Sequence, residues 1–238
     1  MSDFSRLFTI YVLQVILVII HGFLLYKIIK RKKKTKTSIS LSFFFTFIII
    51  AFILNLIYVP IQINPIVFIL YIIVVFLLLF AAFFLVLTLL NLHLEINFKV
   101  KFVIGLFYLT IVILILFIPN GIRYDQGTNW NPKYNWEVFI AIYLYFVVMI
   151  LIPSIIILLK IIKKIYETKL KKRLWSYFIG EIILTTGSFG LALYNTWENQ
   201  TFRFVWPFIL FLLITLNGLL VYYGLGKEFS LKNNRKGT

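Results

Sequence analysis

One carboxylic acid, Glu181, lies within an otherwise apolar stretch, "FIGEIILTTGS" at positions 178–188. At about 100° per residue, Thr185 and Ser188 follow it on the same face of a helix. Carboxyl groups within a membrane face a protein interior or a wet cavity rather than acyl chains. A carboxyl group with hydroxyl groups beside it can hold a proton, bind a small ligand or accept hydrogen bonds from other helices. This stripe is therefore the first candidate for a functional site.

His21 and Asn217 are two further polar residues in apolar stretches, and counting from the membrane edges places both in the same half of the bilayer as Glu181. We expect the three side chains to approach one another. Two interpretations of such a cluster stay open. It is either a site for a ligand, a proton or an ion, or a set of satisfied hydrogen bonds between helices, each contributing about 1 kcal/mol. The candidate ligand or proton site comprises Glu181, Thr185, Ser188, His21 and Asn217.

A second stripe on the same predicted helix consists of small residues, Ser176, Gly180, Gly187 and Gly190, on a face roughly opposite Glu181. Small residues let helix backbones approach closely in lipid. Because both stripes require protein neighbours, we expect this helix to be largely enclosed.

Pro153 lies in the middle of the fifth apolar stretch and is the candidate hinge. Proline has no N–H group, so it frees a backbone carbonyl one turn earlier and usually kinks the helix. The sequence pattern is the same for a hinge that moves and for a static kink, so both interpretations stay open.

Residues for catalysis and for cofactors are scarce in this chain. It contains no cysteine and two histidines, His21 and His93, without spaced carboxylates, so neither a disulfide nor a metal site is expected. Ser188 has no base nearer than His21, which is expected at a different depth, and no glycine-rich phosphate loop is present. We therefore expect neither an enzyme nor a bound cofactor.

The elements that position these residues are apolar stretches long enough to cross a bilayer. Hydrophobic residues make up 62% of the 238 positions and include 26 Phe, which is more apolar surface than a soluble domain of this length can bury. A bilayer core of about 30 Å requires roughly 20 apolar residues per helix, and solid blocks without alternation favour helices over strands. The sequence predicts an all-α membrane protein in which seven transmembrane helices form a single domain over residues 1–238. Their approximate ranges are 7–29, 39–59, 65–91, 101–120, 137–160, 174–196 and 204–225.

Lysine and arginine are segregated between alternate loops. The connections after the first, third and fifth helices, together with the tail from Gly226, hold 20 of the 24 basic residues, and the opposite side holds Arg6, Arg123, Lys133 and Arg203. Loops with an excess of basic residues lie in the cytoplasm. We therefore expect a multi-pass plasma-membrane protein whose N-terminus lies outside and whose C-terminus lies in the cytoplasm.

The partners expected from this charge pattern are the lipid bilayer itself and anionic lipids of the inner leaflet, which attract juxtamembrane lysines. A cytoplasmic signalling protein is a second candidate partner for the basic loops. Because the basic residues follow the alternation of the loops, their placement gives no reason to expect nucleic acid.

Aromatic residues gather near the expected outer ends of the helices, where Trp130, Tyr134, Trp136, Trp197 and Trp206 fit an interfacial belt. The longest outer connection, residues 119–137, carries Asn-Trp-Asn-Pro and Tyr-Asn-Trp clusters. These clusters either rest on lipid headgroups or cover an external pocket.

The layout resembles that of seven-helix receptors and sensors. Pro153 is similar to the proline common in the fifth helix of G-protein-coupled receptors, and "NGLLVYYGLGKEF", with Asn217, Tyr223 and Phe229, is similar to the end of their seventh helix. Gly218 stands where the proline of that ending is expected, and the acid–arginine–aromatic triplet of the third helix is absent. The layout is also similar to the seven-helix input modules of some histidine kinases and cyclases. These resemblances imply a module that relays a signal to a separate partner.

Microbial rhodopsins share the predicted topology but hold retinal on a lysine of the seventh helix, and "WPFILFLLITLNGLLVYY" contains none. Retinal is therefore not expected at that position.

Two functions follow from the layout. We expect a sensor or receptor-like protein that relays a small ligand or a membrane signal to a cytoplasmic partner. The alternative is a small transporter with a parallel 3+1+3 repeat, because helices one to three and five to seven have the same orientation and each set has a strongly basic loop after its first helix. The Pro-Gln signature of such transporters is absent.

Overall fold

The computed structural model of the chain describes residues 9–31, 34–93 and 97–227. Over these residues, seven helices are long and apolar enough to cross a membrane, which confirms the predicted all-α, seven-helix fold of a multi-pass membrane protein. Phe229 and the rest of the basic tail lie outside the described residues. The spans are Tyr11–Ile29, Lys36–Tyr58, Ile66–His93, Phe98–Leu116, Trp136–Lys164, Thr168–Thr196 and Gln200–Gly226.

Short π-helical segments extend or interrupt three of the seven spans. The elements in chain order are η1 (Thr9–Leu13), α2 (Gln14–Ile29), α3 (Lys36–Tyr58), α4 (Ile66–His93), α5 (Phe98–Leu116), β1 (Ile122–Arg123), the 3₁₀ turn η2 (Gln126–Thr128), β2 (Lys133–Tyr134), α6 (Trp136–Leu144), η3 (Tyr145–Leu151), α7 (Ile152–Lys164), α8 (Thr168–Thr196), α9 (Gln200–Val221) and η4 (Tyr222–Gly226).

Polar caps explain why several helices begin before their predicted ranges. The Thr35 side chain accepts a hydrogen bond from the backbone N–H of Ser38, and Asn97 and Asn199 likewise cap α5 and α9. These caps satisfy backbone donors that a helix N-terminus leaves unpaired. The helices therefore start at the caps rather than at the first uncharged run, and lysines such as Lys36 and Lys99 lie in their first turns.

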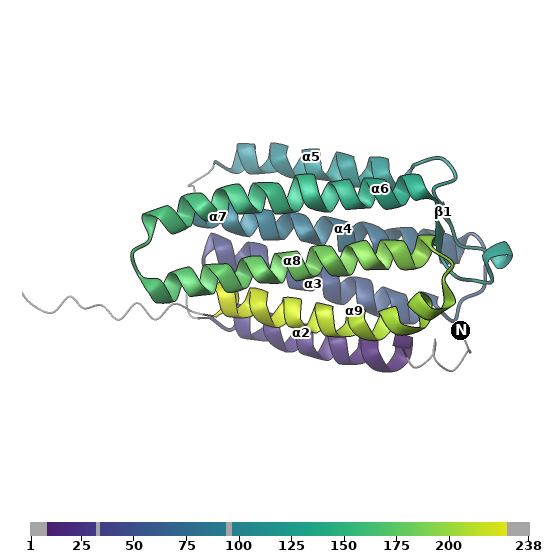
Figure 1. Ribbon diagram of the computed structural model, residues 1–238. Coiled ribbons are helices and arrows are strands. Elements are labelled where there is room, and N and C mark those ends of the chain that lie inside the picture. Colours follow the sequence, from purple (N-terminus) through teal and green to yellow (C-terminus); the bar gives the residue numbers. More distant parts are fainter. Residues whose placement is uncertain (1–8, 32–33, 94–96, 228–238) are drawn as a thin grey trace, which may run out of the picture.

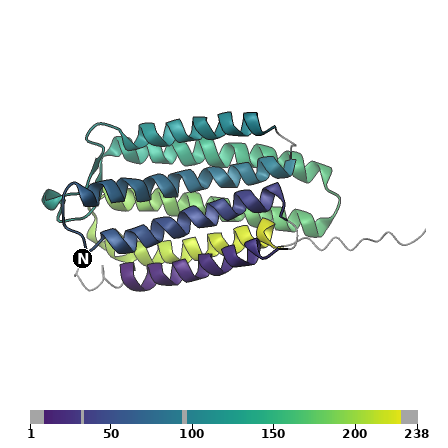
Figure 2. The same ribbon diagram turned by 180° about the vertical axis from the view of Figure 1, so that it is seen from behind.

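The seven spans form one bundle in which α4 and α8 are central. Figures 1 and 2 show α5 along one edge, beside α4 and α6, and show α2 and α9 together along the opposite edge. Buried residues occur along most of α4 and α8, whereas α5 buries only Tyr108, Val112, Ile115 and Leu116. The apolar side chains that remain exposed on the outer helices suit contact with acyl chains.

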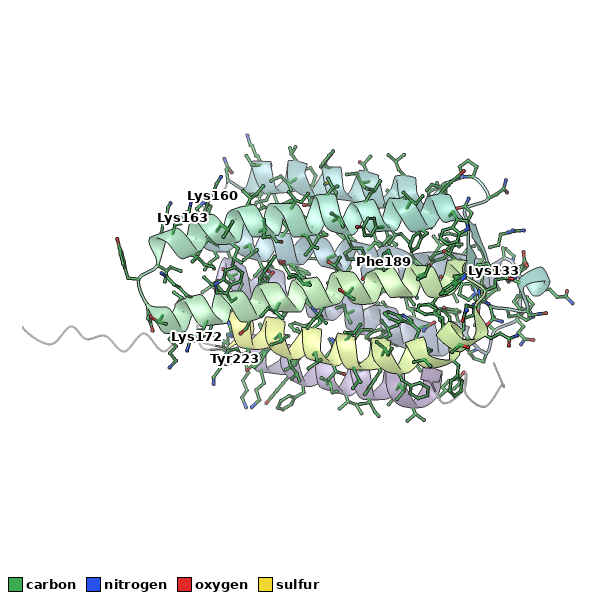
Figure 3. The ribbon with its side chains drawn as sticks, in the orientation of Figure 1. Lys133, Lys160, Lys163, Lys172, Phe189 and Tyr223 are labelled. Atoms are coloured by element: carbon green, nitrogen blue, oxygen red, sulfur yellow. The ribbon has the colours of Figure 1, made fainter. Side chains whose placement is uncertain are left out.

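The two ends of the bundle differ in charge. One end, which we call the hairpin end, carries the antiparallel pair β1–β2 and the α8–α9 connection, with the basic residues Arg123, Lys133 and Arg203. The other, which we call the lysine-rich end, carries the α2–α3 and α7–α8 connections and η4 (Figure 3). Its described basic residues are Lys27, Lys30, Arg31, Lys34, Lys36, Lys99, Lys101, Lys160, Lys163, Lys164, Lys169, Lys171, Lys172, Arg173 and Lys227.

The helix that contains Pro153 changes its hydrogen-bonding pattern just before the proline. The π-helical segment η3 lies between α6 and α7, and Pro153 is the second residue of α7. Proline cannot donate to the carbonyl of Met149, four residues earlier. The hydroxyl of Tyr108 on α5 donates to this carbonyl instead. Pro153, the predicted hinge position, thus lies just after a π-helical interruption. The Met149 carbonyl that it leaves without a backbone donor accepts a hydrogen bond from α5.

Candidate functional site

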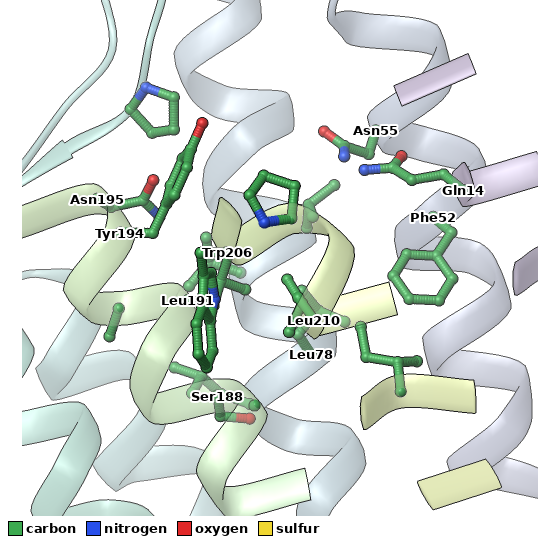
Figure 4. Close-up of a pocket in the computed structure, with 18 of the residues that line it drawn as sticks. Gln14, Phe52, Asn55, Leu78, Ser188, Leu191, Tyr194, Asn195, Trp206 and Leu210 are labelled. Atoms are coloured by element: carbon green, nitrogen blue, oxygen red, sulfur yellow. The ribbon is translucent and has the colours of Figure 1, made fainter. Parts of the chain in front are cut away.

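A cavity of about 270 Å³ lies between the helices in the half of the bundle nearest the hairpin end. Figure 4 shows that its lining comes from several helices, with Gln14, Asn55, Ser188 and Trp206 among the side chains around it. α2, α3, α4, α6, η3, α8 and α9 all contribute residues to it, as does the hairpin loop through Asn131 and Pro132. Its volume is close to the lower end of the range of about 300–1,000 Å³ that is typical of ligand pockets.

The hairpin loop covers this cavity through tyrosines. Tyr134 of β2 shares a hydrogen bond with Tyr71 of α4, and Asn195 of α8 donates to the same Tyr71 hydroxyl at 3.4 Å. The ring of Tyr124 stacks on that of Tyr71 with 5.2 Å between their centroids. Burial raises the pKa of Tyr134 to about 12, so its phenol stays protonated at neutral pH. These contacts hold the loop on the bundle rather than on lipid headgroups.

An ion pair fixes the outer side of the same loop. Lys133 Nζ lies 2.7 Å from a carboxylate oxygen of Glu198, in the α8–α9 connection. The hydrogen bond from Lys133 lowers the pKa of this exposed carboxyl group. The hairpin is therefore tied to α4 below and to the α8–α9 connection beside it.

The cavity lining is mostly apolar, and none of the described residues that form it carries a formal charge. Two lining residues nevertheless keep a buried polar atom without a hydrogen-bond partner in the structure, namely Nε1 of Trp206 and Oε1 of Gln14. Both atoms are enclosed by protein, so neither presents a polar group to the cavity.

The indole ring of Trp206 lies against Gly190. A Cβ atom added at position 190 would come within 1.8 Å of the ring. The absence of a side chain at this position therefore sets where the indole of α9 packs on α8. Trp206, expected in an interfacial belt, is half-buried and lines the cavity. Tyr134 was expected in the same belt, but it is a buried residue of the hairpin loop that also lines the cavity, whereas Trp136 and Trp197 are exposed at the hairpin end.

Glu181 is fully buried and lies about one helical turn from Leu184, toward the lysine-rich end. Ser154 of α7 donates a hydrogen bond to its Oε1 atom at 3.0 Å. Tyr177, one turn further along α8, donates to the backbone carbonyl of Leu85 at 2.7 Å and also interacts with the Glu181 carboxyl group. The partners of the carboxyl group thus lie on the α4 and α7 side of α8. Ser154 directly follows Pro153, so the carboxyl group contacts the helix that η3 interrupts.

His21 and Asn217 lie on the other side of α8, at the contacts among α2, α3 and α9. Asn217 donates to the carbonyl of Gly180 at 3.0 Å, and Nδ1 of His21 donates to the carbonyl of Leu17 at 2.8 Å. The His21 ring packs beside Phe45 and Phe52, with centroid distances of 5.8 and 6.1 Å.

Hydrogen bonds thus join Glu181 to α7 and Asn217 to the backbone of α8, and no described bond joins the carboxyl group to His21 or Asn217. Ser188 lines the cavity itself. The other candidate residues each retain one buried polar atom without a hydrogen-bond partner. These atoms are Oε2 of Glu181, Oγ1 of Thr185, Nε2 of His21 and Oδ1 of Asn217. The role of these residues as a ligand or proton site stays a prediction.

The stripe of small residues on α8 packs against α9, as its composition predicted. A Cβ atom added at Gly180 would lie 2.9 Å from a methyl group of Val221, and one added at Gly187 would lie 3.4 Å from Leu210. Both stripes of α8 therefore have protein neighbours. The helix is not enclosed all round, because Ile179, Ile182 and Thr186 lie on an exposed face between the two stripes.

Arginines close the lysine-rich end of α9. Arg173 of α8 donates to the carbonyls of Tyr223, at 3.1 Å, and of Lys227, and Arg31 donates to the carbonyl of Leu225 at 3.2 Å. The last carbonyls of a helix have no partners within it, and basic side chains near a helix C-terminus stabilise it. These contacts tie α8 and the end of α2 to η4.

Several lining residues could not be selected from the sequence. Gln14, Asn195 and Trp206 are single polar or amphipathic residues in apolar helices, and nothing local distinguishes them from interfacial ones. The sequence clusters that contain Asn131 and Tyr134 did indicate the cavity, because one of their two interpretations was that they cover an external pocket. Among the described residues, no group of three or more His, Cys, Asp or Glu side chains could hold a metal ion.

Comparisons of the chain with protein-family models, with curated proteins and with solved structures found no match.

Proposed function

We propose that this chain is a plasma-membrane sensor or receptor-like protein that binds a small ligand in the cavity and relays its presence to a separate cytoplasmic partner. In this proposal the chain itself catalyses no reaction. The observation that carries the proposal is the placement of the cavity, which lies at one end of the bundle under a loop fixed to its rim. The other half of the bundle is packed around Glu181 and closed by arginines.

The proposed orientation follows from charge. The lysine-rich end is assigned to the cytoplasm, because basic residues accumulate in cytoplasmic loops, and the hairpin end is assigned to the outside. The cavity then lies in the outer half of the membrane. Lysines of the inner end would meet anionic lipids or an acidic surface of the partner.

The proposed relay runs along α8. Leu184 lines the cavity, Glu181 one turn away bonds to α7, and Tyr177 a further turn away bonds to the backbone of α4. Arg173, in the next turn, holds the end of α9. A ligand that displaces the cavity end of α8 therefore acts on contacts with three other helices. The interruption at η3 and Pro153 gives α7 a place at which to bend.

A test can imitate occupancy of the cavity with a side chain. Ser188→Trp fills part of the cavity, and Thr186→Trp places the same side chain on the exposed face of α8 two residues away. Because the chain contains no cysteine, spin labels can be attached at cysteines introduced for Lys30 and Lys163. In nanodiscs, electron–electron resonance distances between these labels should shift with Ser188→Trp and stay unchanged with Thr186→Trp. Identical distance distributions in both variants would contradict the relay.

Transport is the second candidate, and one observation favours it. The cavity lies between residues of spans one to three and residues of spans five to seven, and within the described part of the chain α5 contributes none of its lining. This is where a 3+1+3 transporter would hold its substrate. Proteoliposome measurements of proton and solute flux decide between the two candidates. A flux that Glu181→Gln abolishes would replace the sensor proposal by transport, and no flux above that of empty liposomes is expected.

A further inference from the structure

We infer that the ligand of the cavity is an uncharged, lipophilic molecule with about a dozen non-hydrogen atoms. This inference rests on the proposed function, and it names the class of ligand from the chemistry of the lining.

The lining excludes a charged ligand. A charge taken from water into an apolar site costs several kcal/mol unless an opposite charge or several hydrogen bonds compensate it. None of the described lining residues is charged, and Glu181 has its hydrogen-bond partner on α7 rather than in the cavity. Neither a carboxylate nor an ammonium group would therefore find a counter-charge here.

The volume sets the size of the ligand. An apolar protein cavity of about 150 Å³ holds benzene, which has six carbon atoms. In the same proportion, the cavity of about 270 Å³ takes roughly eleven non-hydrogen atoms. 1-Decanol has this size, and decanoate and decylammonium are matched probes that differ in charge.

Saturable binding of tritiated 1-decanol to the protein in nanodiscs, above that of empty nanodiscs, tests the assignment. We expect saturable binding to the natural chain and to Thr186→Phe, and loss of binding in Ser188→Phe, whose ring occupies part of the cavity. Unlabelled decanol should compete for the site, and decanoate at pH 8 and decylammonium should not.

The competition experiment on the natural chain decides the assignment even if a variant fails to fold. Absence of saturable binding, or displacement of decanol by either charged probe at equal concentration, would overturn it. The relay is tested separately by the spin-label distances. Decanol binding without a distance change in Ser188→Trp would support the ligand class and overturn the relay. A distance change in Ser188→Trp without decanol binding would support the relay and overturn the ligand class.

Discussion

At the residue scale, single polar groups lie among apolar neighbours in the interior of the bundle. The sequence was sufficient to predict that Glu181 is buried against protein, because a carboxyl group inside an apolar helix must face protein or water. It could not identify the partner of Glu181, since Ser154 is one of many hydroxyl residues and its position beside the carboxyl group depends on how α7 packs against α8. Which side chains meet across two helices depends on how the helices pack, and a local sequence pattern does not reveal that packing.

The bond between Ser154 and Glu181 should contribute measurably to stability. Ser154→Ala removes the donor and leaves a buried carboxyl oxygen without a partner, so we expect a loss of about 1 kcal/mol in the free energy of unfolding. Thr186→Ala is the control, because its exposed hydroxyl bonds only to the carbonyl of Ile182 in its own helix. Unfolding by SDS titration in mixed micelles measures both variants, and equal losses would contradict the assigned role of the buried bond.

Gly190 should tolerate no side chain. A methyl group there overlaps the indole of Trp206, so Gly190→Ala should displace the ring, destabilise the protein by about 1–3 kcal/mol and alter the tryptophan fluorescence. Gly22→Ala is the matched control, since a Cβ atom added at Gly22 would have no atom within 4 Å apart from its chain neighbours and the backbone of its own helix. We expect the control to retain full stability in the same SDS titration. A Gly190→Ala protein with unchanged stability and fluorescence would show that the indole does not pack there.

At the element scale, hydrophobic patterning predicted all seven helices but not their internal changes of winding. Solid apolar blocks fix where a chain enters and leaves a bilayer, because the membrane thickness sets the length. The ends differ from prediction where Thr35, Asn97 and Asn199 act as caps. The π-helical segment η3 could not be predicted beyond the presence of Pro153, since it depends on Tyr108 reaching the freed carbonyl from α5.

Tyr108 and Pro153 should therefore be energetically coupled. In the natural chain, Tyr108→Phe leaves the Met149 carbonyl without its donor and should destabilise the protein. In a Pro153→Ala background, the new N–H at position 153 can donate to this carbonyl, so the same tyrosine substitution should cost less. A double-mutant cycle, measured by unfolding in mixed micelles, should give a coupling energy of about 0.5–2 kcal/mol. Additive effects would show that Tyr108 does not compensate for the proline.

At the scale of the whole molecule, the segregation of charge was readable from the sequence because the loops alternate along the chain. The structure gathers the basic connections at one end of the bundle and the hairpin at the other (Figure 3). The cavity could not be predicted from the sequence, because it exists only where six of the seven spans and the hairpin loop leave the space among them unfilled.

The orientation can be tested with single cysteines in this cysteine-free chain. Gln126→Cys lies in the exposed loop at the hairpin end, and Lys163→Cys lies at the lysine-rich end. A membrane-impermeant maleimide applied to intact cells should label position 126 and leave position 163 unlabelled until the cells are permeabilised. The reverse pattern would place the cavity in the inner leaflet and overturn the proposed direction of signalling.

The close packing between α8 and α9 has a consequence for how the bundle can change shape. Gly190 lies near one end of this interface, and Gly224 of η4 lies near the other. A Cβ atom added at Gly224 would lie 2.9 Å from the carbonyl oxygen of Arg173 and 2.8 Å from the backbone nitrogen of Tyr177. Two helices packed this tightly near both ends of their interface cannot slide past each other without a collision. They must therefore tilt as one stiff unit, and the deformation has to be absorbed at their borders with α2, α6 and α7.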